Sequence, residues 1–306
     1  MPIDIRDIEA GPLQTRFKWI KIQLLSGCTS SIVEISLLLP LDVIKTRLQL
    51  QKNTLLKGLQ HYNGVIDAFV KIYRQEGITA FWRGLIPPLL SDTPRRAIKF
   101  MAFEQLKPVL QFGPEPTFIT YALAGGIAGT IEAVLQTPFE VVKITQQANR
   151  RKRLRTLTVA KDIFKNGGFG FQGFFKGVTA TVYRNFIYHV AYLGLYSTGR
   201  DITPVSQTDI TEFFRKFGLA FISGCIGCFL SIPFDVIKSR IQGPQPVNGE
   251  IKYSRVFPTL HTIYREEGIA ALFKGITPQL LRTGPGGVIL LLGFEYMNEL
   301  LITKLV

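Results

Sequence analysis

Residues 232–242 read IPFDVIKSRIQ, and the same order of proline, acid and base occurs twice more in the chain. Residues 39–49 read LPLDVIKTRLQ and residues 137–147 read TPFEVVKITQQ. The prolines of the three strings are separated by 98 and 95 residues. A period of this length indicates that one structural unit is repeated three times.

A second string follows each of the first at a similar distance. It combines an aromatic residue, a base and a glycine, and it reads FWRG at 81–84, FFKG at 174–177 and LFKG at 272–275. An acid and a glycine precede it in the first and third units, as Glu76-Gly77 and Glu267-Gly268. In the second unit we align Phe169-Gly170 with that pair.

These strings divide the chain into an N-terminal tail and three repeats. We expect the tail at 1–17 and the repeats at 18–110, 115–203 and 213–306. Each repeat has one apolar stretch before its proline and one after its aromatic-base-glycine string. The stretches are long enough to cross a membrane as helices. They are near 20–39, 84–106, 118–137, 177–199, 216–232 and 276–301. The sequence therefore predicts an all-α membrane protein with six transmembrane helices.

The composition supports a membrane protein with anionic partners. Of 306 residues, 46% are hydrophobic and only 19% are charged, and the net charge is +14. A basic excess of this kind indicates nucleic acid, anionic lipid or small anions as partners. The basic run 150–155 is compatible with nucleic-acid binding, but that function predicts a soluble protein, whereas the repeated spans favour a membrane protein.

Features of an enzyme are missing from the sequence. The three cysteines make no disulfide framework, and no catalytic triad or metal-ligand cluster is apparent. Residues 168–173 satisfy GxGxxG, but no strand precedes them, so a dinucleotide site is not expected. We predict that the protein is not an enzyme and has no cofactor and no metal.

The loops differ in charge. The loops inside the repeats carry most of the Lys and Arg, whereas 108–116 and 201–212 carry none. The loops inside the repeats should face the compartment that retains positive charge, and six spans then place both termini on the opposite side.

The acid and base of the opening string can pair between repeats. In a threefold bundle, we predict pairs of Asp42 with Lys143, Glu140 with Lys238, and Asp235 with Lys45, which would close one mouth of a central cavity. Three glutamines nine residues after the prolines would brace these pairs by hydrogen bonds. They are Gln49, Gln147 and Gln242.

The triplicated strings resemble those of the mitochondrial carrier family over nearly the whole chain. The resemblance implies threefold pseudosymmetry, short helices on the matrix surface, an inner-membrane location and alternating access. It also implies that the three predicted pairs form the matrix gate. Cardiolipin would bind the helix N-termini near Gly84, Gly177 and Gly275, and the protein is expected to be a monomer.

The family also implies a cytosolic gate at the ends of the even-numbered spans, where the match is partial. Glu104 and Lys107 fit the pattern, but the second repeat has only Arg200 and the third only Glu295. We predict contacts of Glu104 with Arg200 and of Glu295 with Lys107, and a cytosolic gate weaker than the matrix gate.

The family resemblance places substrate contacts about seven residues after each aromatic-base-glycine string, at Ser91, at Arg184 and Asn185, and at Arg282. An arginine inside a membrane span is costly and marks a functional site. Two such arginines at one depth can each bind a carboxylate, which favours a dicarboxylate substrate.

Other ionisable residues lie close to these positions in the sequence. Arg95 and Lys99 follow Ser91 at helical spacing and should face the cavity, whereas we expect Arg96 to point elsewhere. Glu34 and Glu132 lie six residues before their prolines. They are possible proton sites, or they are hydrogen-bonded partners of the cavity bases, which is the reading we favour.

Longer stretches resemble the branch of the family that carries 2-oxodicarboxylates. They are 84–105, 137–150, 232–253 and 282–287. This resemblance implies counter-exchange of 2-oxoadipate and 2-oxoglutarate. The alternatives are a carrier of another di- or tricarboxylate, such as citrate or malate, and a pore on the same fold that leaks protons.

Overall fold

The structure is a computed structural model of the 306-residue chain. It describes residues 13–51, 61–111, 113, 115–149, 155–204, 208–245 and 252–305. Every regular element in these ranges is helical, as the sequence predicts, and none of the described residues forms a strand.

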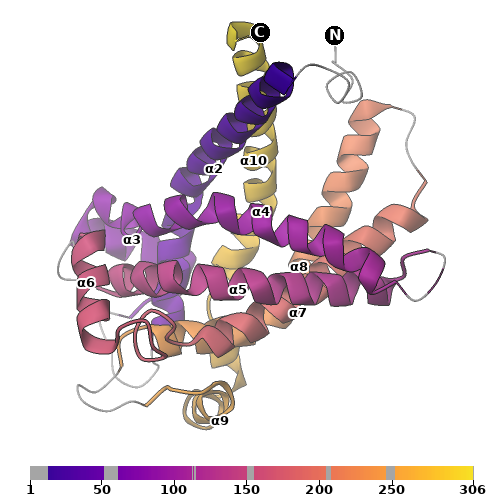
Figure 1. The fold of residues 1–306 in the computed structure, drawn as a ribbon. Coiled ribbons are helices and arrows are strands. Elements are labelled where there is room, and N and C mark those ends of the chain that lie inside the picture. Colours follow the sequence, from indigo (N-terminus) through magenta and orange to yellow (C-terminus); the bar gives the residue numbers. More distant parts are fainter. Residues whose placement is uncertain are drawn as a thin grey trace.

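Six long helices form the body of the molecule (Figure 1). They are α2 (Leu13–Leu50), α4 (Ile86–Val109), α5 (Phe118–Ala148), α7 (Val178–Ile202), α8 (Asp209–Gln242) and α10 (Ile276–Leu305). Each repeat also has one short helix between its long ones, namely α3 (Val65–Glu76), α6 (Thr156–Gly167) and α9 (Val256–Glu267). Two 3₁₀ turns, η1 (Ile78–Trp82) and η2 (Ile269–Phe273), follow α3 and α9.

The odd-numbered spans continue as helices past the prolines of the opening string. Pro40, Pro138 and Pro233 lie inside α2, α5 and α8. Each helix therefore continues beyond the predicted apolar stretch to about the end of the proline-acid-base string. A proline removes one backbone hydrogen bond, which helices inside a protein can tolerate when neighbouring groups satisfy the freed carbonyl.

Glycines end the three short helices at equivalent places. Gly77, Gly168 and Gly268 follow the last helical residue and have φ values of +77°, +57° and +80°. Because glycine adopts positive φ without steric cost, the chain can reverse here toward the next long helix. Gly168 thus occupies the place that the sequence alignment assigned to Gly170, and the alignment of the second repeat was wrong by two residues.

The long helices form a closed ring in chain order. Each packs against the next, and α10 returns to pack against α2. In Figure 1, α4, α5 and α7 lie side by side, while α2 and α10 form a separate pair. The first described turn of α2 and the last turns of α10 lie at the same end of the molecule, away from the short helices.

The end that carries the short helices has its own apolar core. In the first repeat, Ile44 of α2 packs with Ile72 of α3 and Phe81. In the third, Ile237 of α8 packs with Ile263 of α9. Burial of such side chains fixes the short helices against the ends of α2 and α8, where the opening strings lie.

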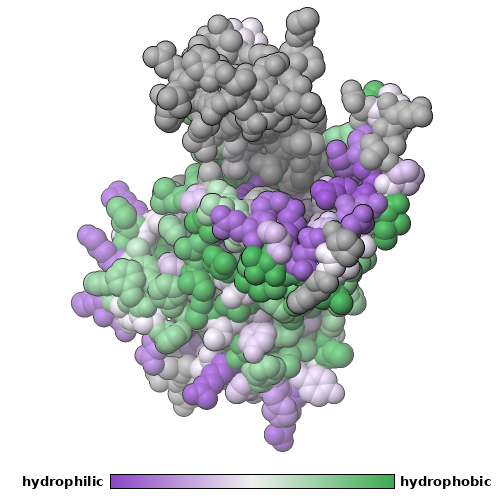
Figure 2. All heavy atoms as spheres, turned by 45° about the vertical axis from the view of Figure 1, so that its right-hand side comes forward, coloured by the Kyte–Doolittle hydropathy of each residue, from purple (hydrophilic) through white to green (hydrophobic). Residues whose placement is uncertain are grey.

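Hydropathy alone identifies only half of the spans. By length and apolar composition, α2, α5 and α8 qualify as candidate membrane spans among the described residues. Charged residues lower the hydropathy of α4, which carries Asp92, Arg95, Arg96 and Lys99. Outward-facing side chains such as Leu37, Phe221 and Phe229 remain exposed, and Figure 2 shows broad hydrophobic areas on the visible side. Apolar surface of this extent is suited to contact with lipid.

Candidate functional site

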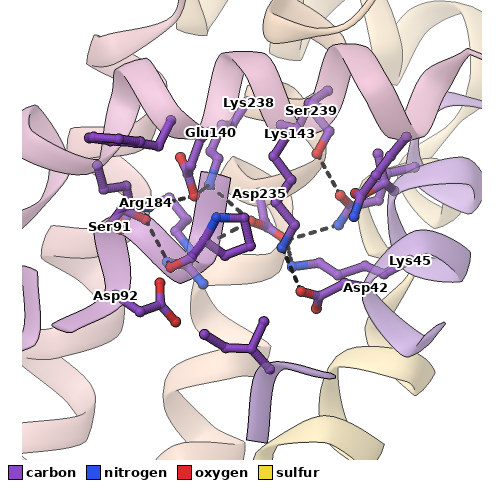
Figure 3. Close-up of a pocket in the computed structure, with 18 of the residues that line it drawn as sticks. Asp42, Lys45, Ser91, Asp92, Glu140, Lys143, Arg184, Asp235, Lys238 and Ser239 are labelled. Carbon is purple, nitrogen blue, oxygen red and sulfur yellow. Dashed lines mark hydrogen bonds and ion pairs between the residues drawn. The ribbon is translucent and has the colours of Figure 1, made fainter. Parts of the chain in front are cut away.

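Three ion pairs between repeats close one end of the ring. Lys143 Nζ lies 2.5 Å from Asp42 Oδ2, Lys238 Nζ lies 2.7 Å from Glu140 Oε1, and Lys45 Nζ lies 2.5 Å from Asp235 Oδ2. These are the three pairs that the sequence predicts, and Figure 3 shows them converging from α2, α5 and α8. Each pair joins two different repeats, so together they link all three.

One of the three predicted glutamine braces is present. Gln49 donates a hydrogen bond to Asp235 Oδ2 at 2.9 Å. Gln147 instead accepts a hydrogen bond from Thr46, and Gln242 donates one to Thr181. Within the described residues, therefore, Gln147 and Gln242 join helices through hydroxyl groups and contact no gate carboxylate.

Both predicted substrate arginines contact acids of these ion pairs. Arg282 Nη1 of α10 lies 3.2 Å from Asp42 Oδ1, and Arg184 Nε of α7 lies 3.4 Å from Asp235 Oδ1. Asp42 therefore has one lysine and one arginine partner, and Asp235 has Arg184 beside Lys45 and, at 3.9 Å, Lys238. The arginines are tied to the closed end of the ring, which the sequence did not predict.

The ion pairs and the arginines line one cavity of about 110 Å³. Its charged lining consists of six bases and four acids, a surplus of two positive charges. The bases are Lys45, Arg95, Lys143, Arg184, Lys238 and Arg282, and the acids are Asp42, Asp92, Glu140 and Asp235. The site is thus suited to a small molecule with two negative charges.

Two other predicted contact residues differ in how they meet this cavity. Ser91 lines it and is buried, and its hydroxyl lies 3.5 Å from the Pro88 carbonyl oxygen. Asn185 is fully buried and does not line the cavity. Its side-chain oxygen accepts a hydrogen bond from Arg184 Nη1 at 2.7 Å, so Asn185 holds the guanidinium in place.

A second charged cluster lies along α4 and α5. Arg95 contacts Asp92 at 2.8 Å and Glu132 at 3.1 Å, and it donates to Gln136 at 2.9 Å. Lys99 lies 3.9 Å from Glu132, and it does not line the cavity although the sequence placed it there. Glu132 is thus a hydrogen-bonded partner of one cavity base, Arg95, which agrees with the reading favoured from the sequence.

His189 completes this cluster, and sequence reasoning missed it. Its Nε2 lies 2.7 Å from Glu132 Oε2, and both side chains are buried. Glu132 precedes Pro138 by six residues and His189 follows Arg184 by five, so no local motif joins them. Only the packing of α5 against α7 brings them together.

Arg96 does not line the cavity, which agrees with the expectation that it points elsewhere. Arg96 Nη2 lies 2.7 Å from Glu34 Oε2 of α2 and 3.8 Å from Asp92 Oδ2. The helical spacing from Ser91 places Arg96 about 100° away from Arg95, but the long side chain reaches across to the neighbouring span. Glu34 is therefore also paired with a base.

One predicted contact of the opposite gate, between Glu104 and Arg200, is not formed in this structure. Lys107 pairs with Glu104 of its own helix at 2.5 Å, and Arg200 pairs with its neighbour Asp201 at 3.2 Å. The predicted contact between Glu104 and Arg200 is thus wrong for this state, because both residues are paired within their own helices. The side chain of Glu295 lies outside the described residues.

Comparison with known proteins agrees with this architecture. A family model described as "Mitochondrial carrier protein" matches residues 18–113, 114–205 and 210–305. The chain belongs to the mitochondrial carrier family. It is therefore a transporter-family protein with a threefold repeat of helix pairs, and a multi-pass protein of the mitochondrial inner membrane.

Relatives within the mitochondrial carrier family are similar over almost their whole length. The chain is 45% identical over 277 residues to the Homo sapiens protein named mitochondrial 2-oxodicarboxylate carrier, covering 90% of this chain and 92% of the relative. It is 36% identical to mitochondrial 2-oxodicarboxylate carrier 2 of Saccharomyces cerevisiae, with the same coverage. It is 37% identical to mitochondrial citrate transporter D of Aspergillus niger, covering 89% of this chain and 91% of the relative.

Proposed function

We propose that this protein exchanges 2-oxodicarboxylates, such as 2-oxoadipate and 2-oxoglutarate, across the mitochondrial inner membrane. The names of the human and yeast relatives support this substrate class. The observation that carries the proposal is the cavity, which has a surplus of two positive charges and two arginines that contact gate acids, Arg184 of α7 and Arg282 of α10. A diacid would neutralise that surplus with its two carboxylates.

The charge balance favours a dicarboxylate over a tricarboxylate. Citrate is the substrate named for the Aspergillus niger relative, and its fully ionised form carries three negative charges. In this cavity a trianion would leave one negative charge without a partner. An unpaired charge in a poorly hydrated site is costly, so we expect citrate to be transported less well than 2-oxoglutarate.

Substrate binding would weaken the gate through the two arginines. In the closed state, Arg282 is bound to Asp42 and Arg184 to Asp235. Substrate carboxylates compete for the same guanidinium groups, and each arginine that turns to the substrate leaves its aspartate with one base fewer. The ion pairs of the gate then hold less strongly, and the energy of substrate binding offsets the cost of opening.

The remaining predicted roles follow from this scheme. The three ion pairs act as the matrix gate, and Glu104, Lys107, Arg200 and Glu295 act at the cytosolic side when the carrier reverses. Ser91 and Arg95 border the bound substrate, and Lys99 supports Arg95 through Glu132. Both termini face the intermembrane space, because the basic loops inside the repeats face the matrix.

We further propose that the protein works as a monomer and binds cardiolipin at three helix N-termini. The helices α4, α7 and α10 begin just after Gly84, Gly177 and Gly275, whose φ values are +79°, +70° and +84°. The free N–H groups of a first helical turn favour a lipid phosphate.

Counter-substrate dependence in liposomes tests the transport function. We expect labelled 2-oxoglutarate to enter liposomes preloaded with 2-oxoadipate and not empty ones, because an exchanger stalls without solute on the far side. Uptake into empty liposomes that collapses a proton gradient would instead indicate a leak through Glu34 or Glu132.

The same assay tests the site. Arg184→Gln and Arg282→Gln should each reduce exchange by about 100-fold or more, since each removes a charge-assisted contact to a carboxylate. Arg74→Gln is the matched control, because Arg74 of α3 is exposed and does not line the cavity. Exchange at the wild-type rate by both cavity variants would refute the site.

A further inference from the structure

The first repeat contains a buried cluster that ties its helices together at the closed end. Arg47 of α2 is 1% exposed and forms a two-pronged ion pair with Glu76, the last residue of α3. Arg83 pairs with the same carboxylate and donates a hydrogen bond to the Asn149 carbonyl oxygen of the second repeat at 2.8 Å. Arg47 Nε also donates to the Gln147 carbonyl oxygen at 3.3 Å, so Glu76 holds two bases that both reach the next repeat.

The third repeat contains the equivalent cluster. Arg240 of α8 pairs with Glu267, the last residue of α9, at 2.7 Å, and Lys274 lies 2.9 Å from the same carboxylate. Lys274 also donates a hydrogen bond to the Gln51 carbonyl oxygen of the first repeat at 3.0 Å. Every base in both clusters therefore contacts a carboxylate.

The second repeat lacks both the arginine and the acid. Thr145 stands seven residues after Pro138, where the other repeats have Arg47 and Arg240, and Gly167 ends α6. Lys176 keeps the link to the next repeat, with a hydrogen bond to the Gly243 carbonyl oxygen at 3.1 Å. Among the described residues, however, no carboxylate forms an ion pair with Lys176.

The path of the chain explains why no acid can stand at residue 167. Nine residues separate Gly168 from Gly177, against seven in the other two repeats. The longer loop folds back over the end of α6. A Cβ atom at Gly167 would lie 2.6 Å from the backbone of Gln172 and Gly173, which no side chain tolerates.

A cavity of about 240 Å³ occupies the region of the missing cluster. Thr145, Lys176 and Gln242 line it together with Asn166 and Gln172. Gln242 is 1% exposed, and its side-chain oxygen has no hydrogen-bond partner. A buried amide group with a free polar atom is costly unless something fills the space beside it.

We propose that this cavity is a binding site for a small anion with a carboxylate or phosphate group, which takes the place of the glutamate found in the other repeats. Lys176 would supply the positive charge, and the side-chain amide of Gln172 would donate a hydrogen bond. The free atom of Gln242 is an acceptor, so its end group would turn over: the NH2 would donate to the anion, and the oxygen would accept from the Thr181 hydroxyl, to which the NH2 now donates. The bound anion would stabilise the closed end at the second repeat. The site is separate from the transport cavity, which Lys176 does not line.

Two charged groups face the cavity and act in opposite directions. Burial lowers the pKa of Lys176, and no carboxylate among the described residues pairs with it, so a bound anion would relieve an existing cost. Asp162 lines the same cavity but is exposed, and its negative charge weakens anion binding. Asp162→Asn should therefore strengthen the response to an anion.

Thermal unfolding of the purified protein in neutral, lipid-free detergent tests the site, with inorganic phosphate as the probe and chloride at equal ionic strength as the reference. Phosphate should raise the unfolding midpoint by about 2–4 °C for the wild type. The rise should be lost in Lys176→Gln. It should persist in Lys165→Gln, the matched control on the exposed face of α6, and in Arg282→Gln, which alters only the transport cavity.

A second variant keeps the test decisive if Lys176→Gln fails to fold. Gln172→Glu brings a carboxylate to Lys176, so it should raise the midpoint without phosphate and abolish the phosphate response. An equal rise in Lys176→Gln, Gln172→Glu and the wild type would overturn the proposal. A rise seen only with added anionic lipid would also overturn it, because a lipid headgroup would then be the ligand.

Discussion

The two ends of the helix ring treat their charges differently. At the closed end, every acid of the opening strings pairs with a base from another repeat. At the opposite end, Lys107 and Arg200 pair with acids of their own helices, and Glu104 is largely exposed. Ion pairs thus link different repeats at the closed end, whereas at the other end those of the described residues stay within one repeat.

Under the proposed function, this difference corresponds to a state with the matrix gate closed, and it makes that gate the more stable of the two. One end must be open when the other is closed if the protein works by alternating access, and here the closed end carries all three pairs. Its carboxylates are shielded from water, so breaking a pair is expensive. The ion pairs at the open end are exposed to water and contribute little to stability.

The largest expected effect comes from removing an acid at the closed end. Asp42→Asn leaves Lys143 and Arg282 without their carboxylate partner in a buried site, and we expect a loss of about 3 kcal/mol in the stability of the closed state. Thermal unfolding in detergent measures it. Asp235→Asn should destabilise the closed state by a similar amount. If both variants lose less stability than the breaking of an exposed ion pair costs, about 0.5 kcal/mol, the pairs do not hold this end closed.

Exchanging the partners of one pair should recover part of that loss. In Asp42→Lys combined with Lys143→Asp, the ion pair is restored with reversed polarity, but Arg282 then faces a lysine. We expect the double variant to be more stable than Asp42→Lys alone and less stable than the wild type. A double-mutant cycle of unfolding midpoints measures this difference. Strict additivity of the two changes would contradict a direct contact.

The smallest effect is expected at the open end. Glu104→Gln and Lys107→Gln each break an exposed pair within α4, and each should change the stability of this state by no more than about 0.5 kcal/mol. In both variants the exchange rate in liposomes should change more than the unfolding midpoint. Glu104 and Lys107 are expected to form a gate only when the cytosolic end is closed, which is not the state of this structure. A large drop in the midpoint would show that the open end is held together after all.

Residues that repeat at fixed spacing were predictable from the sequence. Threefold symmetry brings Asp42 to Lys143 and Asp235 to Lys45 once the period is recognised, since each string occupies the same place on its helix. The fold and the helix order follow from the same period.

Contacts whose side chains change type from repeat to repeat were not predicted. Arg96 with Glu34 and His189 with Glu132 occupy equivalent places in the first and second repeats, but the base differs in type. The third repeat has Gly287 and Gly227 at these places, so the pair is absent there. The loop after α6 is two residues longer than in the other repeats. Counting seven residues back from Gly177 therefore selects Gly170, although Gly168 is the residue that ends α6. The contacts at the open end depend on which state the carrier occupies, and a sequence encodes both states.

The central claim is that a diacid withdraws Arg184 and Arg282 from the gate aspartates and so loosens the closed end. A cysteine at Thr46, which is buried one turn beyond Asp42, reports this opening when the native Cys28, Cys225 and Cys228 are replaced by serine. A membrane-impermeant maleimide is applied from the side that the closed end faces, with and without 2-oxoglutarate. We predict that 2-oxoglutarate accelerates labelling several-fold with both arginines present and not at all in Arg282→Gln; equal acceleration in the two proteins would contradict the account.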